Sequence, residues 1–277
     1  MTPARPDLEV LICTIGAEGI RRVAASQRPE IPGVLYLVYW QLPDGDLPVP
    51  DELRNRHDTI VIKSASRGIS VNRNRALSGC GGEYCLMSDD DVDYSEEGLR
   101  ELIRFFDRNP QTDIAAVRYT SGGRFVKRYP ERVTPLGRMP RGWYISAIEI
   151  AFRTDTVKNR VCFNERISIG TEPIICGEED IFLEDARRAG LTMDFFPVTI
   201  GAHDRPSTSD RLAADPRFIF VHGAVMTYTH RRIWPLRLFW HALRSRRLSY
   251  FGPAFRGARY ALKTKILHTD NNDSSAK

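Results

Sequence analysis

Three consecutive aspartates, Asp89, Asp90 and Asp91, directly follow the apolar run Tyr84–Met87. A run of this kind predicts a buried strand, so the carboxylates come where the chain leaves the core. Three neighbouring negative charges cost free energy unless a cation lies among them. In an extended chain Asp89 and Asp91 point the same way and Asp90 the opposite way. Oxygen ligands at this spacing suit Mg²⁺ or Mn²⁺, hard ions that are usually shared with substrate phosphates.

The aspartates also have a purely structural interpretation. Acidic turns are common in proteins, and this one is followed by Ser95, a residue type that caps the N-termini of helices. A solvated acidic turn before a helix would explain the same letters. The residues alone leave both interpretations open.

A second acidic group, Glu178, Glu179 and Asp180, is predicted to lie in the first turn of a helix. The positive end of the helix dipole stabilises acids there, which is a sufficient structural reason for them. The apolar residues Ile181–Leu183 follow at once and bury the same helix. That burial favours a position at the edge of a sheet, where a carboxylate could act in catalysis.

Basic residues surround a glycine at the start of another predicted helix. Gly68, with Arg67, Arg73 and Arg75 nearby, could hold a diphosphate. A solvated basic helix face explains these residues equally well. His203 follows a predicted strand in the segment GAHDRPSTS, and a single histidine in such a place is usually structural.

The elements that must position these groups alternate along the chain. Strands are predicted from β-branched and aromatic runs at 8–14, 34–40, 59–63, 84–87, 112–119 and 191–200. Helices are predicted between them at 69–79, 95–109 and 177–190. Short strands that alternate with helices indicate an α/β fold with a mainly parallel sheet. The middle of the chain, 120–176, is predicted to be irregular or antiparallel.

The composition, 42% hydrophobic and 27% charged, is that of a globular protein. No apolar run approaches the ~20 residues that span a bilayer. The first ten residues lack the hydrophobic region of a signal peptide, so we expect the protein in the cytoplasm. The five cysteines have no close pairing pattern and are expected to be reduced, mostly buried thiols.

Taken together, the motifs resemble those of the family 2 glycosyltransferases. The resemblance rests on LICT, SVNRNRAL, GGEYCLMSDDDV, GEEDIFL and GLTMDFFPVTIGAH in this order, and it covers roughly residues 8–205. It implies the GT-A fold, a Rossmann-like fold of nucleotide-diphospho-sugar transferases. It also implies a metal-dependent, inverting hexosyl transfer from a nucleotide-sugar, most commonly a UDP-sugar. The expected acceptor is a hydroxyl of a glycan or a lipid-linked molecule in bacterial surface polysaccharide synthesis.

The resemblance also assigns roles to the acidic residues and the histidine. It implies that Asp91 binds the divalent cation, while Asp89 and Asp90 hold the metal, the ribose or the sugar. Asp180, with Glu179 beside it, falls at the motif that carries the general base. His203 is expected to be the last metal ligand, and an imidazole ligand suits Mn²⁺ better than Mg²⁺.

Donor-binding residues follow from the same resemblance. Arg73 and Asn74 match the RN pair that precedes the strand with the aspartates, and Arg67 lies in the loop before them. Family members commonly carry PTYN after the first strand and DDGS after the second, where this chain has CTIG and YWQLPDG. Thr14 and Gln41 would replace the usual contacts to the base, so the motifs leave the nucleobase open.

Two other functions use the same residues. Aspartate-nucleophile phosphatases also place D-x-D after an apolar strand, but normally after the first strand of the chain and with Thr or Val where Asp93 stands here. A non-catalytic nucleotide-sugar binding module would keep the fold and lose turnover. Nucleic acid is not expected as a partner, because no nucleic-acid motif accompanies the basic residues.

The positive charge is concentrated at the C-terminus. Residues 231–277 hold 11 Lys or Arg and two Asp, which leaves a net charge of −4 for residues 1–230. We expect a catalytic domain at 1–230, a basic helical extension at 231–268 and a disordered tail at 269–277. Within the extension, four apolar residues follow helical spacing: Leu236, Phe239, Trp240 and Leu243.

A basic helix with an apolar stripe is typical of segments that lie on an anionic membrane surface. The expected location is therefore the inner face of the cell membrane, as a peripheral protein. The alternatives are that the stripe packs on the catalytic domain or forms a contact in an oligomer.

Overall fold

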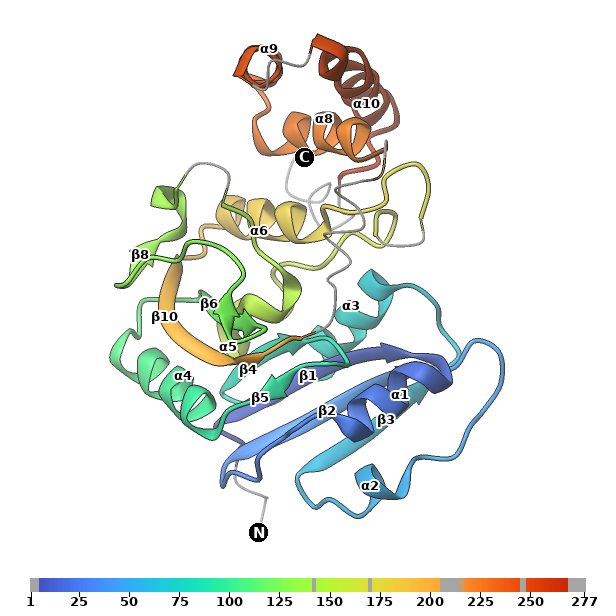
Figure 1. The fold of residues 1–277 in the computed structure, drawn as a ribbon, viewed down its shortest axis with the longest axis vertical. Helices are drawn as coiled ribbons and strands as arrows, with labels where there is room; N and C mark the ends of the chain where they lie inside the picture. Colours follow the sequence, from blue (N-terminus) through green and yellow to red (C-terminus); the bar gives the residue numbers. More distant parts are fainter. Residues whose placement is uncertain are drawn as a thin grey trace. The chain divides into compact units, whose positions relative to one another are not determined.

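The computed structural model describes residues 5–140, 143–168, 171–204, 215, 217–244 and 248–268. The chain forms two compact units (Figure 1). The first comprises Met1–Arg160 with Arg187–Arg205, and the second comprises Val161–Ala186 with Pro206–Lys277. The boundary expected near residue 230 falls inside the second unit, and the expected tail at 269–277 lies outside the described residues.

The first half of the sheet is parallel, as the alternation of strands and helices predicts. It is built from β1 (Leu8–Ile15), β2 (Val34–Gln41), β3 (Thr59–Ser64) and β4 (Tyr84–Ser88). Their order is β3-β2-β1-β4. In this half of the sheet each neighbouring pair of strands is parallel, so the carboxyl ends of all four strands meet at one edge.

The second half of the sheet is mixed. It contains β6 (Ile114–Ser121), β9 (Ile150–Arg153), β10 (Met193–Ala202) and the short strands β5 (Asp93–Tyr94), β7 (Arg124–Phe125) and β8 (Thr134–Pro135). Strand β9 lies antiparallel between β4 and β6, and β10 returns parallel to β6. The antiparallel character predicted for the middle of the chain is therefore confirmed.

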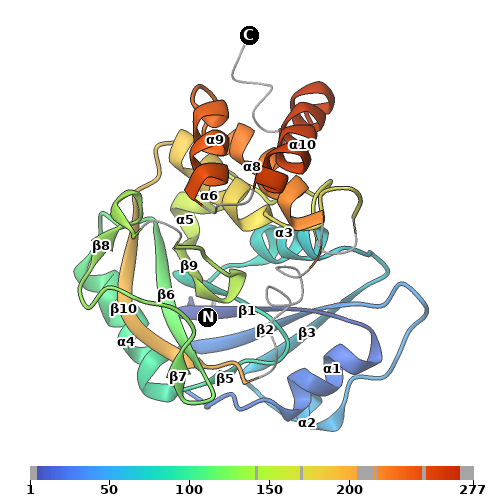
Figure 2. The ribbon, with the colours of Figure 1, turned by 45° about the horizontal axis from the view of Figure 1, so that its top comes forward.

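Helices cover both faces of this sheet (Figures 1 and 2). They are α1 (Gly16–Ala25), α2 (Asp51–Arg54), α3 (Ile69–Gly79), α4 (Glu96–Arg108) and α5 (Thr154–Val157). Val38 and Trp40 of β2 share a core with α1 and α4. The intervening Tyr39 points to the other face, where its hydroxyl lies against Gly79 of α3. The predicted α/β fold with a mainly parallel sheet is thus confirmed.

The second unit consists mainly of helices. These are α6 (Glu178–Arg188), α8 (Arg217–Thr229), α9 (Trp234–Arg244) and α10 (Phe251–Thr264). Its core joins Ile174, Ile175 and Ile181 to apolar residues of α8 and α10. None of the helices in the described part of the chain is long and apolar enough to cross a membrane.

Two glycines let α8 and α10 pack with their backbones in contact. A Cβ on Gly223 would lie 1.9 Å from the carbonyl oxygen of Ala254. A Cβ on Gly257 would lie 1.9 Å from the carbonyl oxygen of Phe220. Because both obstacles are backbone atoms, a side chain at either position would force the helices apart.

We therefore expect Gly257→Ala to lower the free energy of unfolding by about 1–3 kcal/mol, the usual cost of overpacking. Gly252→Ala on the same helix is the matched control, because its Cβ would meet nothing closer than 3.8 Å. Chemical denaturation of both variants measures the difference. Equal stability of Gly257→Ala and the control would contradict the close backbone contact.

Candidate functional site

Each aspartate of the turn after β4 faces a different cationic side chain. Asp90 accepts two hydrogen bonds from Arg22 of α1, from Nε at 2.7 Å and from Nη2 at 2.8 Å. Asp89 lies 3.6 Å from Nη2 of Arg73 on α3. The carboxylates therefore do not point as they would in an extended chain, because each one turns toward its own partner.

The third aspartate meets the histidine that the sequence singled out. Oδ1 of Asp91 lies 3.0 Å from Nε2 of His203, just beyond the end of β10. The backbone N–H of His203 donates to the carbonyl of Thr120 at 2.8 Å, which fixes the loop beside β6. Hydrogen bonding to Asp91 raises the pKa of His203 above its ordinary value. The structure thus brings together two of the three predicted metal ligands.

Asp90 is held by α1 and β1 together. Besides Arg22, the hydroxyl of Thr14 donates to its Oδ2 at 2.6 Å. Gly19 of α1 makes room for this contact, since a Cβ there would lie 2.0 Å from Oγ1 of Thr14 and 2.8 Å from Oδ2 of Asp90. With three donors from the protein, Asp90 anchors the turn to β1 and α1.

The turn has a partial fit for a divalent cation. Among the described residues, no three side chains of His, Cys, Asp or Glu are grouped to hold a metal on their own. Asp91 and His203 nevertheless converge as a carboxylate and an imidazole, a donor pair that suits Mn²⁺. Mg²⁺ and Mn²⁺ sites of nucleotide enzymes commonly take one or two protein ligands and complete their shell with substrate phosphates.

The turn itself is shaped by two hydroxyls. Tyr94 donates to Oγ of Ser88 at 2.5 Å, and that hydroxyl donates to the carbonyl of Asp89 at 2.8 Å. Ser95 accepts a hydrogen bond from the N–H of Gly98 at 3.0 Å and caps α4, as predicted. The cap stabilises the helix, while the acids before it are engaged by cations from elsewhere in the fold.

The residues at the ends of β1 and β2 are buried and bonded within the protein. Thr14 is 3% exposed and Gln41 is 2% exposed. Nε2 of Gln41 donates to Oγ of Ser66 at 2.9 Å. The sequence analysis missed Asn72 of α3, whose Nδ2 donates to the carbonyl of Tyr39 at 2.6 Å. Its buried Oδ1 has no hydrogen-bond partner in the part of the chain that the structure describes.

The predicted basic residues are divided between the site and the surface. Arg73 is 4% exposed and lies at the acidic turn. Asn74 is half-buried on the same helix. Arg67 is exposed and pairs with Asp44 at 3.1 Å, in the loop after β2. Arg75 donates from Nη2 to the carbonyl of Lys63 at 3.4 Å, and its buried Nη1 has no partner among the described residues.

In the second unit, the three acids of the first turn of α6 differ in exposure. Glu178 is buried, Glu179 is half-buried and Asp180 is exposed. The pKa of Asp180 is raised to about 6, first because the surrounding protein desolvates its carboxyl and second because Glu179 adds a like charge. Since the side chain keeps an exposed surface, the carboxyl is partly desolvated and still open to a reactant.

Helix α6 is firmly packed behind these acids. Ile181 and Phe182 are buried, and the ring of Phe182 stacks on Phe163 at 4.4 Å between centroids. The hydroxyl of Tyr228 on α8 donates to Oδ1 of Asp185 at 2.5 Å. The apolar residues that follow the acids therefore fix the helix that carries them.

A buried ion pair in the first unit was not predicted. Nζ of Lys127 donates to Oε2 of Glu149 at 2.6 Å, and both side chains are less than one tenth exposed. Tyr129 and the N–H of Ser146 also donate to Glu149, at 2.7 and 2.8 Å. Nζ of Lys127 further lies 4.1 Å from the ring centroid of Tyr144. Burial raises the pKa of Glu149 and lowers that of Lys127.

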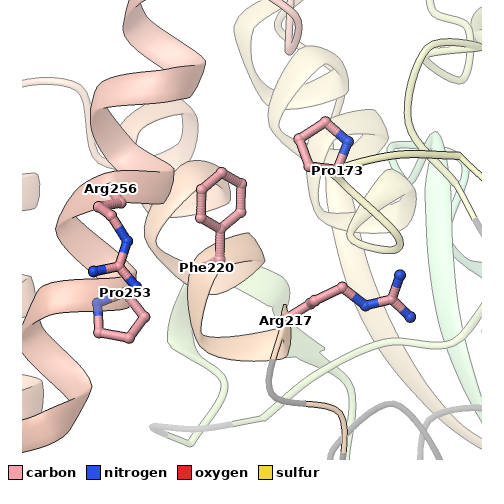
Figure 3. A pocket seen from close by; sticks show the side chains of 5 residues that line it. All are labelled: Pro173, Arg217, Phe220, Pro253 and Arg256. Atoms are coloured by element: carbon pink, nitrogen blue, oxygen red, sulfur yellow. The ribbon is translucent and has the colours of Figure 1, made fainter.

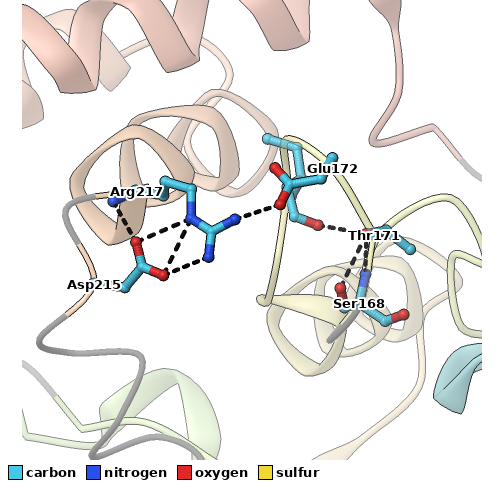
Figure 4. A network of polar contacts seen from close by, with 6 residues as sticks. Ser168, Thr171, Glu172, Asp215 and Arg217 are labelled. Carbon is cyan, nitrogen blue, oxygen red and sulfur yellow. Dashed lines mark hydrogen bonds and ion pairs between the residues drawn. The ribbon is translucent and has the colours of Figure 1, made fainter.

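The second unit also contains an open pocket of about 370 Å³. Figure 3 shows the residues that line it: Pro173, Arg217, Phe220, Pro253 and Arg256. Arg217 is held by Asp215 at 2.6 Å and by Glu172 (Figure 4). Hydrogen bonding to Arg217 lowers the pKa of Asp215 to about 2. The described lining of the pocket therefore consists of apolar side chains and arginines, one of them neutralised by acids.

This geometry can be compared with known proteins. The fold is the GT-A fold of sugar-nucleotide transferases. The structure is similar to the crystal structure of S. aureus TarS 1–349, with a TM-score of 0.59 and 15% identity, over 92% of this chain and 91% of that chain. It is also similar to TarS 1–349 in complex with UDP-GlcNAc, with a TM-score of 0.61 and 15% identity, over 92% of each chain. At this identity the likeness establishes the fold.

A family model matches part of the sequence. Residues 43–164, a little under half of the chain, match the model of glycosyl transferase family 2. The resemblance to the family 2 glycosyltransferases seen in the motifs is confirmed by this match, and the GT-A fold is confirmed by the solved structures. The matched residues include the acidic turn, whereas Asp180 and His203 lie outside them. A search of curated proteins finds no match.

The ion pair of Lys127 and Glu149 generates a test of stability. We expect Lys127→Met to lower the free energy of unfolding by about 3–5 kcal/mol, because it leaves a buried carboxylate without its cation. The double variant Lys127→Met/Glu149→Gln should recover most of this loss, since Gln can still accept from Tyr129. Urea denaturation of the two variants makes the comparison. A double variant less stable than Lys127→Met would show that the unpaired buried carboxylate is not the cause of the lost stability.

Proposed function

We propose that the protein is an inverting, metal-dependent hexosyltransferase that uses a nucleoside diphosphate sugar. The observation that carries the proposal is the convergence of Asp91 and His203 at the carboxyl end of β4, at 3.0 Å. Ligands bind at this edge in open α/β sheets. The complexes of TarS with UDP and with UDP-GlcNAc support a UDP-sugar as the donor.

Asp91 and His203 would hold Mn²⁺ or Mg²⁺, with Asp89 as the neighbouring carboxylate. The ion, when bound, stabilises the charge that builds on the leaving nucleoside diphosphate. Arg73 lies beside Asp89 and can donate to a diphosphate oxygen from its planar guanidinium. Asp90 positions the turn through Arg22 and Thr14, so its role in donor binding is to keep the other two acids in place.

The remaining donor contacts come from the ends of β1 and β2 and from α3. Thr14 and Gln41 are assigned to the base, and Asn74 and Arg67 to the donor. The internal hydrogen bonds of Thr14 and Gln41 make them rigid supports of the base site. Arg67 would have to leave Asp44 to reach a phosphate, which is feasible for an exposed pair of little net stability.

Asp180 is proposed as the general base. It would take the proton from the acceptor hydroxyl as that oxygen attacks the anomeric carbon from the face opposite the leaving group. The reacting carbon has oxocarbenium character, as in glycoside hydrolysis. Glu179 contributes a like charge that keeps the base form of Asp180 ready to accept a proton. The result is inversion at the anomeric carbon.

The acceptor is proposed to be a glycan or a lipid-linked molecule in bacterial surface polysaccharide synthesis. The location proposed with it is the cytoplasm, at the inner face of the cell membrane, where a lipid-linked acceptor would be within reach. The family match favours a glycosyltransferase over an aspartate-nucleophile phosphatase. The position of the aspartates also does, because they follow the fourth strand of the chain, whereas such phosphatases normally carry them after the first.

We expect donor binding to require Mn²⁺ or Mg²⁺ and Asp91→Ala to remove both the metal dependence and the transfer. Thermal unfolding with UDP-sugar, with and without the ion, reports binding apart from turnover, because a bound donor raises the apparent stability. Glu97→Ala, an exposed acid on α4, is the control and should behave as the native protein. Full activity in excess chelator would refute the role of the metal.

We expect Asp180→Asn to keep donor binding and to lower transfer at least ~10²-fold, a typical contribution of a general base. The pKa of Asp180, about 6, lies above its ordinary value, so the active carboxylate is lost as the pH falls through about 6. The native rate should therefore decline below that pH, and this decline should be absent from Asp180→Asn.

Glu179→Gln is the matched control for the second acid. It removes a like charge without removing the base, so the transfer rate should fall less and the acidic limb of the pH profile should move to lower pH. A larger loss with Glu179→Gln than with Asp180→Asn would assign the base to Glu179 instead.

A further inference from the structure

Helix α9 carries apolar side chains on two opposite faces. Its inner face packs in the second unit, where Leu238 and Ala242 are 0% and 3% exposed. Its outer face carries four large apolar residues, each half exposed or more: Leu236 65%, Phe239 54%, Trp240 69% and Leu243 50%. Ile233, directly before the helix, is 47% exposed. A helix that is apolar all round normally buries both faces. The outer face therefore calls for an occupant.

In the described chain, Leu236, Phe239, Trp240 and Leu243 do not belong to the core of the second unit. In the described chain all four are exposed, while the helix is held by its other face. Exposed aromatic residues continue beside it, because Phe255 of α10 lies 6.0 Å from the ring of Trp234 and 5.9 Å from that of Phe251.

The charge around the outer face has a single sign. Between Arg231 and His268 the sequence has ten Lys or Arg and no Asp or Glu. Arg237 and Arg244, about two helical turns apart, flank the outer face and are exposed. A second copy of the same face would bring cation against cation, which disfavours self-association. An anionic surface is complementary to both the charge and the apolar residues.

The dimensions of α9 fit a helix that lies along a surface. Its 11 residues span about 16 Å, roughly half the thickness of the hydrocarbon core of a bilayer. Trp and Phe prefer the boundary between headgroups and acyl chains, and arginine can reach lipid phosphates while its stem stays on apolar surface.

We propose that α9 docks on an anionic lipid bilayer, with its outer face at the boundary between headgroups and acyl chains and its arginines on lipid phosphates. The inference does not rest on the transfer chemistry. Docking is measured without donor or metal, so its failure would leave the proposed glycosyl transfer intact, and the reverse also holds.

The test is co-sedimentation of the full chain with vesicles of phosphatidylcholine, with and without phosphatidylglycerol. We expect binding to the anionic vesicles that weakens as salt is raised, because the arginine contacts are screened. Phe239→Ala/Trp240→Ala should lower the partition coefficient at least about tenfold, since each lost side chain removes a large buried apolar area. Arg237→Glu/Arg244→Glu should do the same on anionic vesicles only.

Ile60→Ala/Phe125→Ala is the matched control, because these residues are 49% and 50% exposed but belong to the first unit. It should bind as the native chain does. Trp240→Phe supplies a second readout: it should keep most of the binding and lose the blue shift of tryptophan emission that bilayer insertion of Trp240 would cause.

Three results would overturn the proposal. One is the absence of binding to anionic vesicles by the native chain. Another is equal binding by the native chain, the outer-face variant and the charge variant. The third is a stable dimer, seen by light scattering, that Phe239→Ala/Trp240→Ala dissociates while vesicle binding is absent; the occupant of the face would then be a second copy.

Discussion

The structure depends on how the repulsion among three adjacent carboxylates at the end of β4 is neutralised. Each one receives a cationic partner from a different element: Arg22 from α1, Arg73 from α3 and His203 from the end of β10. In the low dielectric of a half-buried site, such pairing outweighs the mutual repulsion of the acids. The elements that supply the cations come from distant parts of the first unit's sequence, so the turn is neutralised only when these segments are brought together.

The three pairs differ in their contacts, and this difference suits the aspartates to different roles. Asp90 is bound by Arg22 and Thr14 and acts as an anchor, whereas Asp91 contacts an imidazole, a group that can itself bind a metal ion. Asp180 differs again, because partial desolvation and the neighbouring Glu179 raise its pKa to about 6 while its surface stays exposed. The environment of each carboxylate, rather than its residue type, thus decides what it can do. One positions the turn, another could bind a cation and a third could accept a proton.

The sequence predicted the parallel strands and the acidic turn, because buried strands have a distinct composition and their carboxyl ends share one edge. The proximity of His203 to Asp91 was expected only from the resemblance to the family 2 glycosyltransferases. The sequence did not predict the partners of the other acids, since Arg22 lies on a helix whose pattern shows only an amphipathic surface. Nor did it reveal Lys127 with Glu149, residues 22 positions apart that are ordinary surface types until the fold buries them. The sequence also did not predict that residues 161–186 group with the C-terminal helices, because contacts between distant segments leave no local pattern.

The glycine contacts between α8 and α10 have a further consequence for the helices beyond the catalytic motifs. Gly223 and Gly257 bring two backbones together, and α9 packs against this pair through Leu238 and Ala242. The conformational entropy of α9 is therefore already lost in the free protein, unlike that of a peptide that becomes helical only on its target. Any partner of its outer face meets a preformed surface, so association needs no coil-to-helix transition and the far-ultraviolet circular dichroism of the chain should be the same before and after it.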